Sequence, residues 1–170
     1  DEQGATLPFD VQLAMMIEHE LDNDAKMFGK TNKKNRKIVS TVEASLNIRE
    51  VVENCNGTID ITPVGSTYVA DSMEENGAIF GGEPCGEYIY QNSVHVPDAI
   101  LAAAKFAEIF CTKGAFSQLK TKYKQNFIAR EKFAAKDKIA TMEKVKKELV
   151  EKQSVAGKIR TDDGVRIDEL

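Results

Sequence analysis

The sequence predicts an α/β fold, a three-layer sandwich in which a small mixed sheet of four strands lies between helices. Short β-branched segments alternate with longer segments whose apolar residues recur at helical spacing, and this alternation indicates the fold class. The chain has 170 residues, of which 42% are hydrophobic and 29% charged, enough for one ordinary core and a small appendage. We therefore expect the sandwich to be followed by an incomplete α+β C-terminal domain.

The expected elements of the sandwich alternate between helices, marked by apolar residues three and four positions apart, and short strands. Asp10 is placed to cap the first helix, a polar loop over 31–36 follows it, and Gly77 ends the third helix. In chain order, we predict a helix of about four turns that carries the apolar positions 14, 17, 21, 25 and 28, then strand 37–42, helix 45–55, strand 58–62, helix 67–76, strand 78–80, strand 87–90 and helix 97–111.

The last two strands and the last helix carry the clearest local signals. The strands flank a glycine-rich bend over 81–86, which is typical of a hairpin. Pro97 suits the first turn of a helix, where its missing N–H is not needed, and Asp98 complements the helix dipole there.

From residue 122 the sequence changes character. Residues 127–134 predict an extended segment, an amphipathic stripe from Ile139 to Val150 predicts a helix, and a strand pair is expected around Asp162-Asp163-Gly164. This pattern indicates the start of another domain. We accordingly divide the chain at 1–8, 9–121 and 122–170, and because it begins without Met we expect both ends to be cut sites within a longer polypeptide.

Charge and hydropathy exclude several classes of function. The net charge of −4 gives no general attraction to nucleic acid or to an anionic membrane. No apolar run approaches the roughly 20 residues that span a bilayer. We expect a cytoplasmic protein with no nucleic-acid or membrane partner.

The cysteines and histidines predict no metal site. Cys55, Cys85 and Cys111 are odd in number and lack CxxC spacing, so neither a disulfide framework nor a zinc site is indicated. His19 and His95 are too few for a multi-histidine site.

The segment 80–86 is the first candidate site, because its glycines let the backbone approach a ligand closely. Pro84 restricts Glu83 to extended geometry, which would hold the carboxylate in a fixed position between Gly82 and Gly86. An ionised carboxylate is a strong acceptor for two neighbouring sugar hydroxyls. The alternative, a hairpin with an exposed glutamate, stays open for this motif alone.

The second candidate is the segment 62–67, where a strand ends in a tight loop before a helix N-terminus. Such a loop can bind hydroxyls or phosphate, with Gly65 and Ser66 in position to do so. Ser66 or Thr67 as a simple helix cap is the structural alternative.

Five segments together resemble the third domain of the α-D-phosphohexomutases, a family that includes phosphoglucosamine mutase and phosphomannomutase/phosphoglucomutase. The resemblance covers nearly the whole chain, with residues 1–4 similar to the end of the preceding metal-loop domain. The segments that carry it are Thr41-Val42-Glu43-Ala44-Ser45, Thr62-Pro63-Val64-Gly65, Gly81-Gly82-Glu83-Pro84, the Pro97-Asp98 helix, and Thr161 to Ile167, which resembles the early hairpin of the fourth domain.

The resemblance implies an isomerase that moves a phosphoryl group between C1 and C6 of a hexose or hexosamine phosphate. It implies that Glu83 and Cys85 grip the sugar hydroxyls, with Gly65, Ser66, Gly82 and Gly86 in the surrounding substrate loops. Cys85 stands where serine is commoner in the family, and Glu87 where histidine often stands. A thiol is the weaker hydrogen-bond partner, which leaves the sugar preference open.

The sequence lacks the family's phosphoserine loop, its Asp-rich loop for Mg²⁺ and its phosphate-binding loop of the fourth domain. We expect these in other domains of the same enzyme, with the Mg²⁺ ligands upstream. The 170 residues alone are then inactive, with no catalytic residue and no bound metal.

The preferred interpretation is a phosphoglucosamine mutase-like enzyme. A phosphomannomutase or phosphoglucomutase, and a non-catalytic sugar-phosphate binding module, remain as alternatives. A third class is a helical interaction module that uses the basic segment 136–152.

Overall fold

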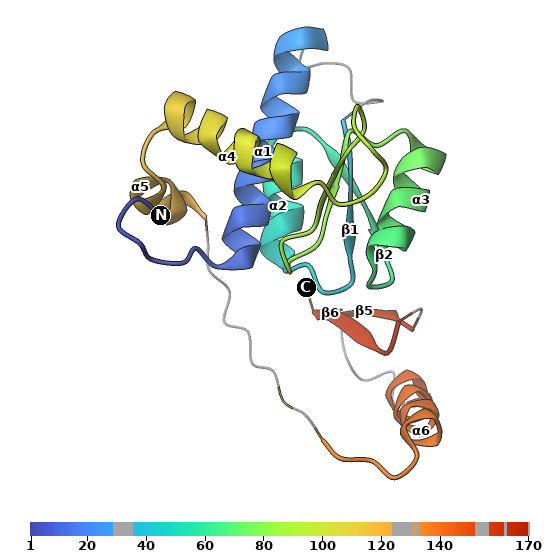
Figure 1. The fold of residues 1–170 in the computed structure, drawn as a ribbon. Helices are drawn as coiled ribbons and strands as arrows, with labels where there is room; N and C mark the ends of the chain where they lie inside the picture. The colour runs from blue at the N-terminus through green and yellow to red at the C-terminus, as the bar shows by residue number, and fades with distance from the viewer. Residues whose placement is uncertain (29–35, 124–130, 132, 152–156, 162, 170) are drawn as a thin grey trace. The chain divides into compact units, whose positions relative to one another are not determined.

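The computed structural model describes residues 1–28, 36–123, 131, 133–151, 157–161 and 163–169. The chain divides into two compact units, Asp1–Asn126 and Phe127–Leu170 (Figure 1). Residues 31–35 of the predicted loop and residues 127–130 and 132 of the predicted extended segment lie outside the described residues.

The first unit is built on a mixed sheet with the strand order β2-β1-β3-β4. Its strands are β1 (Lys37–Thr41), β2 (Thr58–Thr62), β3 (Phe80–Gly82) and β4 (Tyr88–Tyr90). β1 pairs in parallel with β2 and β3, whereas β4 pairs antiparallel with β3. The predicted mixed four-stranded sheet and the hairpin of its last two strands are confirmed.

Helices cover both faces of this sheet (Figure 1). They are α1 (Phe9–Phe28), α2 (Leu46–Asn54), α3 (Ser66–Asn76) and α4 (Ala99–Lys113). Ile38 of β1 is buried in the core that contains α1, α2 and α4, while the next residue, Val39, is buried with Val69 and Met73 of α3. Because neighbouring strand residues point to opposite faces, this pattern confirms the three-layer sandwich.

Two short elements, α5 (Phe116–Leu119) and the 3₁₀ helix η2 (Lys120–Lys122), follow α4 and were not predicted. Lys113 at the end of α4 connects back to α1 by ion pairs of 3.2 Å to Glu18 and 2.8 Å to Asp22. Leu119 and Tyr123 are also buried in the α1 core, so this segment closes one end of the unit.

The second unit contains the predicted amphipathic helix, α6 (Lys138–Glu151), and the predicted strand pair. The strands β5 (Gly157–Arg160) and β6 (Arg166–Glu169) are antiparallel, with Arg160 opposite Arg166. Among the helices of the described ranges, none is long and apolar enough to cross a membrane.

Two predictions at helix ends were wrong. Asp10 lies within the first turn of α1, and it accepts a hydrogen bond from the Ser45 hydroxyl at the start of α2. Pro97 lies just outside α4, because Asp98 is the extended N-cap residue and its Oδ1 accepts a hydrogen bond from the Leu101 N–H at 2.9 Å. The acidic cap therefore displaces proline from the first turn.

The predicted strand 78–80 begins and ends two residues later, so Gly81 and Gly82 belong to the strand and not to the bend. A Cβ added at Gly81 would lie 2.5 Å from both Val69 Cγ1 and Met73 Sδ. At Gly82 it would lie 2.6 Å from Leu13 Cδ1. These glycines let helices on both faces pack close to the strand.

Candidate functional site

The candidate site lies at the edge of the sheet where the three parallel strands end. β1, β2 and β3 run in the same direction, so the segments after Thr41, Thr62 and Gly82 emerge at one edge. α2 follows β1 and α3 follows β2, and these helices pack on opposite faces of the sheet. In α/β sheets, ligands bind beyond the carboxyl ends of neighbouring strands that lead to opposite faces.

Glu83, directly after β3, is the buried carboxylate of this edge, with 4% of its surface exposed. Its Oε2 accepts a hydrogen bond of 3.2 Å from the backbone N–H of Gly65. Gly65 is the N-cap residue of α3 and has a φ of 136°, a conformation that side chains disfavour. The two segments proposed from sequence as candidate sites are thus joined by this contact.

Backbone hydrogen bonds fix the turn that carries Glu83. The Glu83 N–H donates to the Glu87 carbonyl at 2.9 Å, and the Gly86 N–H donates to the Glu83 carbonyl at 3.1 Å. Gly86 has a φ of 96°, which favours glycine. The buried Ser40 hydroxyl donates to the Gly82 carbonyl at 2.7 Å and ties the start of the turn to β1.

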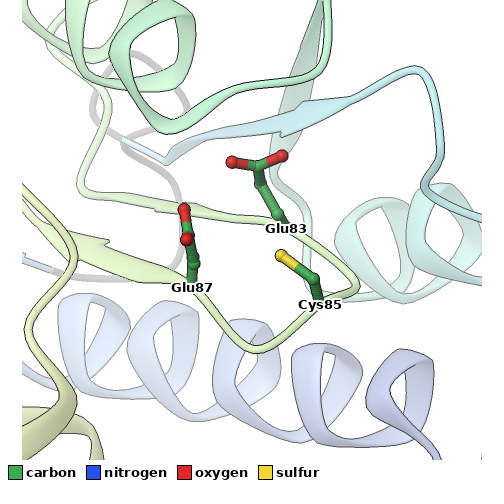
Figure 2. Close-up of side chains that lie close together, drawn as sticks. All are labelled: Glu83, Cys85 and Glu87. Atoms are coloured by element: carbon green, nitrogen blue, oxygen red, sulfur yellow. The ribbon is translucent and has the colours of Figure 1, made fainter.

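Figure 2 shows the side chains of Glu83, Cys85 and Glu87 converging on one another across this turn. Their oxygen and sulfur atoms all lie within 4.8 Å of one another. Glu83 is buried, whereas Cys85 and Glu87 are exposed. The turn therefore holds one buried carboxylate, fixed by its hydrogen bond, beside two exposed groups.

Burial raises the pKa of Glu83 above its ordinary value. The hydrogen bond from Gly65 opposes this shift, and the carboxylates of Glu87 and Glu43 add to it. Burial also raises the pKa of the Cys85 thiol, with the carboxylates of Glu83 and Glu87 acting in the same direction. The thiol is therefore held protonated at neutral pH, as a hydrogen-bonding group and a poor nucleophile.

The three side chains do not fit Mg²⁺. Mg²⁺ requires oxygen ligands in a near-octahedral arrangement, and a protonated thiol is not such a ligand. His19, one of the two histidines, is buried, and its Nε2 lies 3.1 Å from Asn23 Nδ2 and 3.2 Å from Glu108 Oε2. It joins α1 to α4 and lies away from the candidate site.

The structure brings most of the predicted site residues together. Gly82 ends β3, Glu83, Cys85 and Gly86 lie in the turn that follows it, and Gly65 contacts Glu83 from the other segment. Ser66 is the half-buried first residue of α3, directly after this contact. The roles of these residues in binding remain predictions.

Sequence reasoning missed Glu87 and Ser40 as parts of the site. A signal for Glu87 was present, because positions on either side of a tight hairpin turn face each other. Nothing in the sequence marked Ser40, whose hydroxyl reaches a carbonyl 42 positions further along the chain.

The fold and the candidate site define a class of domain. It is a three-layer α/β unit in which a turn at the carboxyl ends of the parallel strands holds a carboxylate in a fixed position. Residues 10–127 match the family described as phosphoglucomutase/phosphomannomutase, alpha/beta/alpha domain III. The chain belongs to this family.

Two archaeal relatives and one solved structure illustrate the similarity. A probable phosphoglucosamine mutase of Methanothermobacter thermautotrophicus is 36% identical over 169 residues, which are 98% of this chain and 34% of the relative. A probable phosphoglucosamine mutase of Methanobrevibacter smithii is 34% identical over 169 residues, which are again 98% of this chain and 34% of the relative. A phosphoglucomutase/phosphomannomutase family protein from Burkholderia thailandensis has the same fold, with a TM-score of 0.74, 19% identity, and coverage of 94% of this chain and 32% of that protein. The chain thus spans about a third of these relatives.

Proposed function

We propose that this chain is the sugar-recognition part of a phosphohexomutase, an isomerase that moves a phosphoryl group between C1 and C6 of a hexosamine phosphate. The observation that carries the proposal is the buried Glu83 carboxylate, which Gly65 holds at the meeting point of the strand ends. Family membership and the names of the archaeal relatives support it. Phosphomannomutase or phosphoglucomutase activity is the alternative within the same family.

In this proposal Glu83 accepts hydrogen bonds from two neighbouring hydroxyls of the sugar ring. Cys85 supplies a weaker thiol contact beside it, from a turn whose shape depends on the positive φ of Gly86. Because the loop is fixed by backbone hydrogen bonds, the hydroxyls are held in the same place while the phosphorylated ends exchange. Mg²⁺, bound by other domains, supplies charge stabilisation for phosphoryl transfer.

The test is phosphosugar mutase activity of the complete gene product with glucosamine, glucose and mannose phosphates. Glu83→Gln keeps the shape of the side chain but removes its charge, so kcat/KM should fall by about 10- to 100-fold, the worth of a hydrogen bond to a charged group. The matched control is Glu74→Gln, an exposed glutamate on α3 that should leave activity unchanged.

Two outcomes would overturn the proposal. Absence of activity with all three sugar phosphates, when Mg²⁺ and an activating bisphosphate are supplied, would favour the non-catalytic binding module. Full activity of Glu83→Gln would remove Glu83 from sugar recognition. The 170-residue chain by itself should be inactive in the same assay.

A further inference from the structure

The turn of the candidate site carries a second carboxylate, Glu87, whose role goes beyond the grip on the sugar hydroxyls. We propose that Glu87 makes this loop selective for sugar phosphates with a cationic amino group, so that hexosamine phosphates are preferred to neutral hexose phosphates. The proposal rests on the proposed function and concerns the same site.

The position of Glu87 is fixed by the backbone. Its carbonyl accepts the hydrogen bond from the Glu83 N–H at 2.9 Å, so the two residues face each other where the turn closes. Their carboxylate oxygens and the Cys85 sulfur lie within 4.8 Å of one another (Figure 2). A ligand that contacts Glu83 therefore also lies within reach of Glu87.

The local charge favours a cation. Glu83 and Glu87 are like charges at short distance, and Glu43 adds a third carboxylate that acts on Glu83. In the described part of the chain, the ion pairs of lysine, arginine and histidine involve neither Glu83 nor Glu87. A positive group placed between the two carboxylates relieves their repulsion.

An ammonium group suits this pair better than a metal ion does. It has N–H donors that can contact both carboxylates, and hydrogen bonds between charged partners are the strong kind. A divalent ion such as Zn²⁺ would have to displace the proton of the Cys85 thiol, and burial and the two carboxylates, which raise the pKa of that thiol, make this more costly. In a hexosamine the amino group is attached beside a ring hydroxyl, so it approaches the turn together with the hydroxyl that Glu83 binds.

The experiment compares kcat/KM of the complete gene product for glucosamine 6-phosphate, N-acetylglucosamine 6-phosphate and glucose 6-phosphate. The N-acetyl sugar keeps the nitrogen but not the positive charge. Glu87 is exposed, so its contribution is screened by water, and Glu87→Gln should reduce the preference for glucosamine over glucose by about two- to fivefold. Glu87→Asp should retain most of the preference, and Glu50→Gln, at an exposed position of α2, should retain all of it.

The outcomes separate this inference from the proposed function. Absence of turnover with every sugar overturns the proposed function and this inference with it. Turnover with the same sugar preference in the unaltered protein and in Glu87→Gln overturns the inference alone. Stoichiometric zinc in the purified protein, lost in Glu87→Gln, would also overturn it, because the cluster would then be a metal site.

Discussion

The contact between Gly81 and α3 gives a prediction about the free energy of unfolding that can be worked out from the structure. A methyl group added at Gly81 would lie 2.5 Å from Val69 Cγ1, whereas ordinary contacts of a Cβ are 3.4–4 Å. Overpacking of this kind costs about 1–3 kcal/mol. A glycine replaced by alanine at a permitted backbone conformation gains about 0.4–1 kcal/mol through the unfolded state. We expect Gly81→Ala to destabilise the protein by about 1–2 kcal/mol, since the clash outweighs the entropic gain.

Val69→Ala should relieve the part of the clash that Val69 makes, while the contact of the added Cβ with Met73 Sδ at 2.5 Å remains. Alone, this substitution removes two buried methyl groups and costs roughly 2 kcal/mol at about 0.8 kcal/mol each, with a further term for the cavity. In the double variant the new methyl group at position 81 occupies part of that cavity. The summed cost of the two single changes should therefore exceed the cost of the double variant by about 1–2 kcal/mol.

Urea unfolding followed by tyrosine fluorescence measures this coupling. The chain has no tryptophan, and its four tyrosines, Tyr68, Tyr88, Tyr90 and Tyr123, all lie in the first unit. Gly114→Ala is the control, because nothing lies within 4 Å of its added Cβ and its effect should add to that of Val69→Ala within about 0.5 kcal/mol. If Gly81→Ala is equally additive with Val69→Ala, the contact with Val69 is not what requires glycine at this position.

Two further predictions concern the cap of α4 and the thiol of the site. Asp98→Ala should reduce the free energy of unfolding by about 1 kcal/mol, while Asp98→Ser should restore most of it; equal losses would contradict a capping role. Because the raised pKa of Cys85 lowers its thiolate fraction at neutral pH, iodoacetamide should modify it more slowly than free cysteine. The rate should also continue to increase at pH values where the rate for free cysteine is already constant. Mass spectrometry at several pH values measures this, and faster modification would show that the site activates the thiol.

Local signals in the sequence were sufficient to predict most of the fold. Strand and helix periodicities located β1, β2 and α1 to α4, and the glycine-rich segment indicated the β3–β4 hairpin that carries the candidate site, because each of these depends on residues near one another in the chain. The shift of β3 to include Gly81 and Gly82 was not predictable in this way. A side chain at either glycine would clash with Val69, Met73 or Leu13, which come from other elements.

Two side chains whose roles were not predicted also depend on distant partners. Arg36 was assigned to a polar loop, yet it is 3% exposed and donates a hydrogen bond to the carbonyl of Cys55, 19 positions away. Ser40 is part of an ordinary strand by sequence, and its hydroxyl matters because β3 ends beside it. Side chains of this kind gain a role when tertiary packing provides the partner.

The position of Glu83 on the one local strand pair of the sheet has a consequence for the order of folding. The β3–β4 hairpin closes through a short turn and can form within about 1–10 μs, whereas the parallel pairs of β1 require crossover helices and form more slowly. Gly65 belongs to one of these crossovers, so the contact that buries Glu83 forms after the turn itself. The free-energy cost of removing this carboxylate from water therefore arises late in folding. A cost at that stage increases the rate of unfolding more than it decreases the rate of folding.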